Sequence, residues 1–324
     1  MAPRRRILSS FTLLFHPPLS SHKDARPCLT DPQGIPLLKS AWDAGITTID
    51  TANVYSNGQS ERVIGRFIKT HSIPRQSLVL MTKVYAFTPD DPSVFTMLHP
   101  ELADTREFVN QGGLSRAAIF NQVDACLARL GTAYIDVLQI HTFDPATPME
   151  ETMRALHDLV ARGTVRYLGA SNLRAWQLAE MNGIAEKRGW TPFSCVQVEH
   201  SLLSRSQEAE MFEYCKYKGL GILPYAPLMK GHLARPFGAD TPRTKSVEDT
   251  FLEKSFTESE KTIIGRVEEL ARKHSLNMAQ IALAWSASKT TSPIVGANTA
   301  ERLLDCIIAE NVLTEDDVKY LEEP

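Results

Sequence analysis

The sequence predicts an α/β protein whose parallel strands close into one (β/α)8 TIM barrel with an atypical or incomplete first strand. Seven short apolar runs, the first at Ile46, are each followed by a segment of helical periodicity. These runs are apolar on both faces, which is typical of buried parallel strands. The alternative, an open doubly wound sheet, predicts a G-x-G-x-x-G turn after an early strand, and the sequence contains none.

The composition is that of a globular protein with a large core. The chain has 324 residues, 43% of them hydrophobic, and a formal net charge of -3, so we expect no nucleic-acid partner. Five widely spaced cysteines without a C-x-x-C pair argue against a disulfide framework and a zinc site. No apolar run approaches the roughly 20 residues of a membrane helix. We expect a cytoplasmic monomer or weak oligomer with no metal and no membrane contact.

The first thirty residues differ from the rest. They carry four arginines and several serines but only one acid, Asp24, which is the composition of a mitochondrial transit peptide. Alternatively, they form a disordered tail, or residues 11–15 form a strand. A barrel needs a strand before residue 31, and only this segment can supply it. We therefore divide the chain into an atypical segment, residues 1–30, and a barrel domain, residues 31–324.

In the first half of the chain, caps and glycines mark the predicted helices. Asp31 caps a helix before Gly45, and Gly131 ends the helix that Ser115 begins. Pro148 takes the favoured first position of a further helix. The predicted helices are 31–42, 59–69, 115–130 and 148–162, and the predicted strands are 46–49, 78–81 and 134–140.

The second half continues the alternation. Thr257 and Glu260 form a capping box, which predicts that a helix begins there. The predicted strands are 165–168, 195–198, 220–223 and 293–295, and the predicted helices are 175–187, 207–218, 257–274, 278–288, 299–308 and 315–321.

Four polar residues follow three neighbouring strands, at the carboxyl ends where barrel enzymes have their active sites. Asp50 ends the first of these strands and Tyr55 lies in its loop, while Lys83 and His141 end the next two. Catalytic residues of such barrels lie at the carboxyl ends of the strands. Each residue alone is more often a cap, a surface charge or a structural histidine. Together they predict a site.

The same residues lie in motifs that resemble the aldo-keto reductase family. Seven motifs occur in order between about residues 34 and 323. They are 43–55, Gly58-Gln59-Ser60-Glu61, Thr82-Lys83-Val84, Gln139-Ile140-His141, 166–172, Val196-Gln197 and Tyr225-Ala226-Pro227-Leu228. Within the family, residues 110–116, 143–148 and 293–297 look most like fungal reductases of the versiconal hemiacetal acetate reductase type, which serve polyketide and related secondary-metabolite pathways.

Carbonyl reduction needs a hydride donor and a proton donor. We expect the hydride to come from a bound nicotinamide and the proton from Tyr55, as general acid. A nearby ammonium favours a phenolate, so we expect Lys83 to lower the pKa of Tyr55 and Asp50 to hold Lys83 by an ion pair. His141 is expected to hydrogen-bond the carbonyl oxygen and orient it.

The resemblance also implies a set of cofactor-binding residues. Ser171, Asn172 and Gln197 would hold the nicotinamide carboxamide, and Tyr225 would stack on the ring. The other residues that it places at the cofactor are Asp50, Leu228, Lys230, Gly296, Asn298 and Arg302. Arg302 occupies a position that reaches the 2′-phosphate in many members, and a guanidinium suits that group. We therefore expect NADPH rather than NADH, although Gly296 stands where other members have a lysine.

The substrate pocket is less defined. Aromatic residues that follow strand ends could form its wall, or could be simple packing: Tyr85, Phe87, Phe143 and Trp176. Residues 86–114 make a connection far longer than the usual loop of about 4–6 residues, and we expect it to be a substrate lid. Residues 230–254 are a second candidate lid.

Together these features predict an NADPH-dependent reductase of an aldehyde or ketone in a fungal secondary-metabolite pathway. One alternative is a cofactor-binding regulatory or partner subunit of the same fold. Another is an enzyme impaired by its altered N-terminus, because a barrel without its first strand exposes two strand edges.

Overall fold

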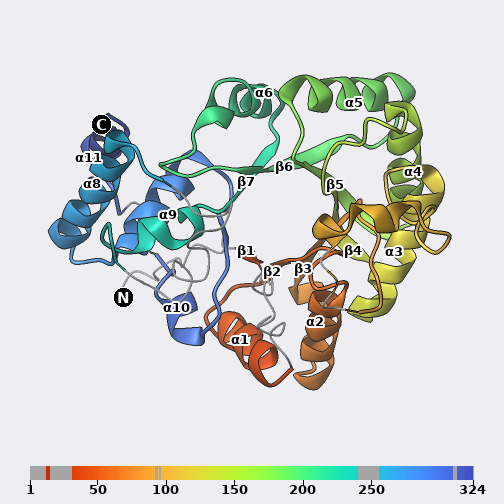
Figure 1. Ribbon diagram of the computed structural model, residues 1–324, viewed down its shortest axis with the longest axis horizontal. Coiled ribbons are helices and arrows are strands. Elements are labelled where there is room, and N and C mark those ends of the chain that lie inside the picture. Colours follow the sequence, from red (N-terminus) through yellow and green to blue (C-terminus); the bar gives the residue numbers. More distant parts are fainter. Residues whose placement is uncertain are drawn as a thin grey trace, which may run out of the picture.

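The computed structural model describes residues 12–14, 31–91, 94, 96–239, 255–308 and 312–323. Within them, parallel strands form one sheet in the order β7-β6-β5-β4-β3-β2-β1-β8. Figure 1 looks along the resulting ring of strands, with the helices outside it. The strands are β1 (Thr12–Leu14), β2 (Thr48–Asp50), β3 (Val79–Val84), β4 (Ile135–Ile140), β5 (Val165–Ser171), β6 (Phe193–Glu199), β7 (Gly221–Tyr225) and β8 (Ile294–Val295).

The first strand comes from the atypical N-terminal segment. Thr12 is in register with Thr48 of β2 on one side and with Ile294 of β8 on the other. The ring closes between β7 and β8, where the backbone amides of Thr291 and Ser292 donate to the carbonyl of Ile222 at 2.9 and 3.3 Å. The fold is therefore the (β/α)8 barrel that the sequence predicts, with a first strand of three residues. The transit-peptide and tail alternatives for the rest of residues 1–30 lie outside the described residues.

The helices follow the strands as predicted, with three shifted ends. Pro148 is the residue before α4, with an extended backbone, and not its first residue. A separate 3-10 turn, Ser206–Glu208, delays the start of α6. The helices of the described residues are α1 (Asp31–Asp43), α2 (Gln59–Thr70), α3 (Arg116–Leu130), α4 (Met149–Ala161), α5 (Ala175–Arg188), α6 (Met211–Lys218), α8 (Glu258–His274), α9 (Met278–Lys289), α10 (Ala300–Leu304) and α11 (Glu315–Glu322).

The predicted helix 299–308 is the third difference, because α10 ends at Leu304. Side chains of the neighbouring α9 region explain this end. Asn277 donates to the carbonyl of Asp305 at 3.0 Å, and Gln280 donates to that of Ile307 at 3.0 Å. These backbone acceptors are therefore satisfied without further helical turns.

The barrel interior is layered. Met81, Cys195, Leu223 and Ile294 form one buried apolar cluster contributed by four strands. Side chains two residues apart on a strand face the same side. Lys83, Gln197 and Tyr225 therefore lie one layer nearer the carboxyl ends of β3, β6 and β7, so the apolar cluster is a floor beneath polar residues.

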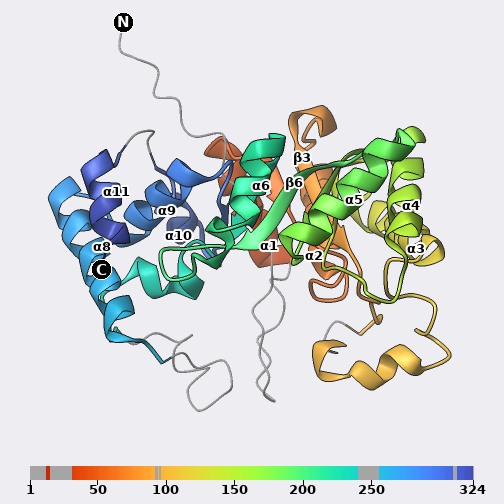
Figure 2. The same ribbon diagram turned by 90° about the horizontal axis from the view of Figure 1, so that it is seen from above.

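A long insertion, residues 86–114, connects β3 to α3. It contains two 3-10 turns, η2 (Thr96–Leu98) and η3 (Pro100–Asp104), which project from one end of the barrel in Figure 2. Its two ends meet, because the amide of Gly113 donates to the carbonyl of Tyr85 at 2.7 Å. Most of the second predicted lid, residues 240–254, lies outside the described residues. Among the helices that the structure describes, none is long and apolar enough to cross a membrane.

Candidate active site

An ion pair between Asp50 and Lys83 lies at the centre of the candidate site. Both side chains are fully buried, and Lys83 Nζ donates to Asp50 Oδ2 at 2.5 Å. The same ammonium donates to the carbonyl of Thr51 at 3.0 Å and to the hydroxyl of Tyr55 at 3.3 Å. The three N–H donors of Lys83 thus bind acceptors at the end of β2 and in the loop that follows it. These bonds hold the ammonium next to Tyr55.

Two buried amides hold the other oxygen of Asp50. Gln139 Nε2 and Gln197 Nε2 donate to Asp50 Oδ1 at 3.0 and 3.1 Å, and Gln197 also donates to Gln139 Oε1 at 3.2 Å. The sequence predicts Gln197 only as a carboxamide ligand and assigns no role to Gln139. The strand register could have revealed this role of Gln139. It lies two residues before His141, and it is paired with Lys83 across β3 and β4.

Burial raises the pKa of Tyr55, and the charge of Lys83 lowers it only in part. Lys83 thus lowers the pKa of Tyr55 as expected, but loss of solvent penalises the phenolate more, so the pKa lies above its ordinary value. Burial disfavours the charge on Lys83, but Asp50 and Tyr55 outweigh it and raise the pKa of Lys83. The lysine is cationic and the tyrosine neutral at neutral pH.

His141 completes the group of four. Its ring lies edge-on to that of Tyr55, with centroids 5.7 Å apart and planes at 79°. Its backbone amide donates to the carbonyl of Val84 at 3.0 Å. The structure thus brings together Asp50, Tyr55, Lys83 and His141, from the ends of β2, β3 and β4.

A second set of predicted residues lies beside His141. Asn172 Nδ2 donates to the carbonyl of His141 at 2.9 Å and to Ser171 Oγ at 3.1 Å. The hydroxyl of Tyr225 donates to Asn172 Oδ1 at 3.0 Å. Asn172 adopts a positive φ of 49°, so its exposed amide turns back over the strand ends. Amide, hydroxyl and aromatic groups are therefore gathered next to the buried ion pair.

The remaining predicted cofactor residues lie after β7 and β8. Ala226, Met229 and Lys230 have positive φ values of 54°, 45° and 55°, and Gly231 has 99°, so the loop that contains Leu228 is unusually twisted. Gly296 and Asn298 are exposed beyond β8. Arg302, also exposed, donates to Asn298 Oδ1 at 2.9 Å.

The four aromatic residues predicted for the pocket divide into groups. Phe143 and Trp176 lie close, with centroids 6.5 Å apart, and Trp176 is 57% exposed. Tyr85 follows β3 and is partly buried. Phe87 is buried and stacks on Phe108 at 4.8 Å, so it packs the interior of the insertion.

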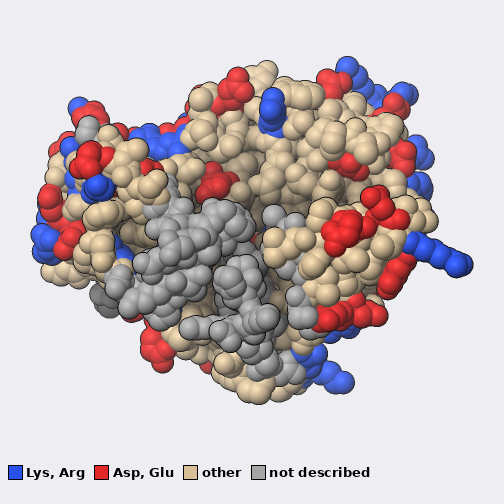
Figure 3. All heavy atoms as spheres, in the orientation of Figure 1, with Lys and Arg blue, Asp and Glu red and all other residues tan. Residues whose placement is uncertain are grey.

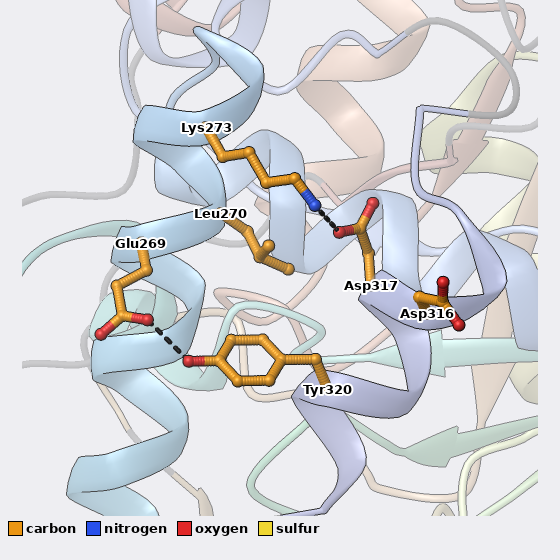
Figure 4. A pocket seen from close by; sticks show the side chains of 6 residues that line it. All are labelled: Glu269, Leu270, Lys273, Asp316, Asp317 and Tyr320. Carbon is orange, nitrogen blue, oxygen red and sulfur yellow. Dashed lines mark hydrogen bonds and ion pairs between the residues drawn. The ribbon is translucent and has the colours of Figure 1, made fainter.

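Other surface features of the described residues carry no comparable chemistry. A shallow groove between α8 and α11 (Figure 4) is crossed by two contacts, Lys273 with Asp317 at 2.7 Å and Tyr320 with Glu269 at 2.6 Å, which fasten the last helix to the barrel. On the face in Figure 3, basic and acidic side chains are interspersed. Among the described residues, no group of three or more His, Cys, Asp or Glu could hold a metal ion.

Comparison with known proteins agrees with this geometry. Residues 25–324 match the sequence model of the Aldo/keto reductase family. An aldo-keto reductase of Fusarium vanettenii is 45% identical over 304 residues, 91% of this chain and 82% of that protein. A putative aryl-alcohol dehydrogenase of Schizosaccharomyces pombe is 45% identical over 294 residues (89% and 90%), and versiconal hemiacetal acetate reductase of Aspergillus parasiticus is 41% identical over 301 (91% and 88%). The chain belongs to the aldo-keto reductase family of oxidoreductases.

Proposed function

We propose that this protein is an NADPH-dependent reductase that converts an aldehyde or ketone to an alcohol, with Tyr55 as its proton donor. One observation carries the proposal: the Tyr55 hydroxyl lies 3.3 Å from Lys83 Nζ, which is itself in a buried ion pair with Asp50. A burial-raised pKa keeps the phenol protonated, and an acid must be protonated to act in reduction.

Each residue of the cluster has a distinct part in this mechanism. Tyr55 gives its proton to the carbonyl oxygen, and the ammonium of Lys83 stabilises the phenolate that is left. Asp50 holds Lys83, and Gln139 and Gln197 hold Asp50, so the charge stays in place throughout. His141 orients the carbonyl oxygen beside the Tyr55 ring. The nicotinamide supplies the hydride when it is bound.

The chemistry of the surrounding donors fits a nicotinamide dinucleotide. Ser171 and Asn172 offer a hydroxyl and an amide for the carboxamide, and the partly exposed ring of Tyr225 offers a stacking surface. The loop that contains Leu228 and Lys230 has several residues with positive φ, and we place the pyrophosphate against the backbone of this loop.

Arg302, whose guanidinium donates to Asn298, supports NADPH over NADH, and we place Gly296 at the same end of the cofactor. An exposed guanidinium at this end of the barrel is matched in geometry and charge to a 2′-phosphate. We expect faster turnover and tighter binding with NADPH. Comparable rates with the two cofactors would contradict this assignment.

We further propose a place in secondary metabolism and a cytoplasmic location. The similar proteins include a versiconal hemiacetal acetate reductase and putative aryl-alcohol dehydrogenases, which favours an aromatic or polyketide-like substrate. Phe143 and Trp176 offer an aromatic wall for it, with Tyr85 as a further candidate, whereas Phe87 packs inside the insertion. The division of the chain into residues 1–30 and 31–324 stays a prediction.

The test is a comparison of the purified protein with its Tyr55→Phe variant, using NADPH and a panel of aromatic and polyketide-like carbonyls. We expect Tyr55→Phe to lose essentially all turnover and to keep its affinity for NADPH, because only the proton donor is removed. In the wild type, the reduction rate should fall through ionisation of Tyr55 only above about pH 10. The reason is that burial raises the pKa of Tyr55 above its ordinary value. Normal turnover by Tyr55→Phe would refute the role of this residue.

A further inference from the structure

The turn that carries Tyr55 has a strained backbone. The next three residues, Ser56, Asn57 and Gly58, have φ values of 47°, 49° and 83°. A left-handed conformation is easy for glycine but costly for residues with a side chain. Two such residues in succession persist only where the surrounding structure holds them.

The insertion supplies that support through the side chain of Asn57. The buried Asn57 Nδ2 donates to the backbone carbonyls of Asp91 and Val94 at 2.7 and 2.8 Å. The amide of Val94 donates to the carbonyl of Asp91 at 3.2 Å, so the two acceptor residues are themselves joined by a hydrogen bond. A second contact lies nearer the start of the insertion, where Asn53 Nδ2 donates to the carbonyl of Ala86 at 2.7 Å.

We propose that Asn57 is a positioning residue through which the insertion, residues 86–114, sets the place of Tyr55. The inference rests on the proposed role of Tyr55 as proton donor. One amide nitrogen has the two donors that the two carbonyls require, whereas a carboxylate has none and a hydroxyl has one. Because both acceptors are backbone atoms, the contact depends on the path of the insertion and not on its side chains.

A pair of glycine variants isolates this contact. Asn57→Gly keeps the positive φ at no steric cost but removes both donors. Ser56→Gly is the matched control, because it relieves the same strain one residue earlier and leaves the Asn57 contact in place. We expect Asn57→Gly to lower kcat for 4-nitrobenzaldehyde with NADPH about tenfold, because a small misplacement of a catalytic group is costly. The Kd for NADPH should not change, and Ser56→Gly should behave as the wild type.

Hydrogen exchange gives a readout that does not depend on turnover. The amides of Asn57, Gln59 and Ser60 are bonded to carbonyls within the turn, so their exchange reports its opening. We expect exchange across residues 55–60 to become about tenfold faster in Asn57→Gly, in line with the loss of one to two hydrogen bonds. Exchange in Ser56→Gly should stay as in the wild type.

A shortened protein tests whether the insertion is the other half of the contact. Its ends meet at Tyr85 and Gly113, so residues 88–110 can be replaced by a short Gly-Ser link. In that background, Asn57→Gly should add nothing to the exchange rate. The inference would be overturned if Asn57→Gly left the hydrogen-exchange rate of the full-length protein unchanged. It would also be overturned if Asn57→Gly raised this rate as much in the shortened protein as in the full-length one. Absence of turnover in the wild type would instead count against the proposed function, and the exchange data would still decide the inference.

Discussion

Lys83 illustrates how much a single buried charge depends on its partner. Its side chain has no solvent exposure, and its ammonium pairs with the equally buried Asp50. Removal of one partner of such a pair leaves an uncompensated charge in the interior and typically costs about 3–5 kcal/mol. The pair therefore connects the stability of the barrel to the chemistry proposed for Tyr55.

We expect Lys83→Met to lower the free energy of unfolding by about 3–5 kcal/mol, because Asp50 is left charged without its cation. The double variant Asp50→Asn/Lys83→Met should recover much of this loss, since no buried charge remains. Urea denaturation of the three proteins measures both effects. A double variant no more stable than Lys83→Met would show that the uncompensated charge is not the cause.

At this scale, the sequence predicts which polar residues share a strand end, but not all that they do. The positions of Asp50, Lys83 and His141 follow from the rule that parallel strands end on one face of a barrel. The contact of Gln197 with Asp50 joins residues 147 apart in the sequence and depends on the stagger of the strands. The pKa of Tyr55 is raised by burial. The extent of burial cannot be predicted from the types of the neighbouring residues.

At the scale of elements, α2 and α3 are joined by a close approach at Gly58. A Cβ built on Gly58 would lie 2.4 Å from Cδ of Arg129. Arg129 Nε donates to the buried carboxylate of Glu61 at 2.6 Å, and Thr82 on β3 donates to the other oxygen of Glu61 at 2.6 Å. The glycine after the Tyr55 turn is thus required by an ion pair between two helices as well as by its φ of 83°.

We expect Gly58→Ala to destabilise the protein more than Gly131→Ala, by about 1–3 kcal/mol. Both glycines have positive φ, but a Cβ at Gly131 meets nothing within 4 Å, so this control carries only the backbone strain. Thermal unfolding of the two variants gives the comparison. Equal losses would mean that Arg129 moves aside at no cost.

The ends of elements are predictable where local capping decides them, and not where distant side chains do. The box of Thr257 and Glu260 marks the start of α8 as predicted. The early end of α10 depends on Asn277 and Gln280, which reach it from a neighbouring helix. The path of the insertion has no periodicity to reveal it, so the partners of Asn57 could not be predicted.

For the whole molecule, the three residues of β1 complete the ring between β2 and β8. Deletion of residues 1–14 removes this strand and leaves two unpaired edges, which favour aggregation. We expect loss of cooperative unfolding and soluble aggregates on size-exclusion chromatography. Deletion of residues 1–8 is the control, because it keeps Thr12–Leu14. A monomeric, cooperatively unfolding product of the longer deletion would contradict a structural role for β1.

The pairing of β1 also has a consequence for synthesis on the ribosome. Its partner Thr48 follows within forty residues, whereas Ile294 comes about 280 residues later. At about 5–20 residues per second, roughly 12–50 s separate the emergence of Thr48 from that of Ile294. Until then the sheet can grow from β1 to β7 but cannot close, so the nascent chain carries open edges at both ends of a nearly complete barrel. Ring closure is therefore a late event, and slow translation of the last third of the message would prolong exposure of those edges to chaperones and to other chains.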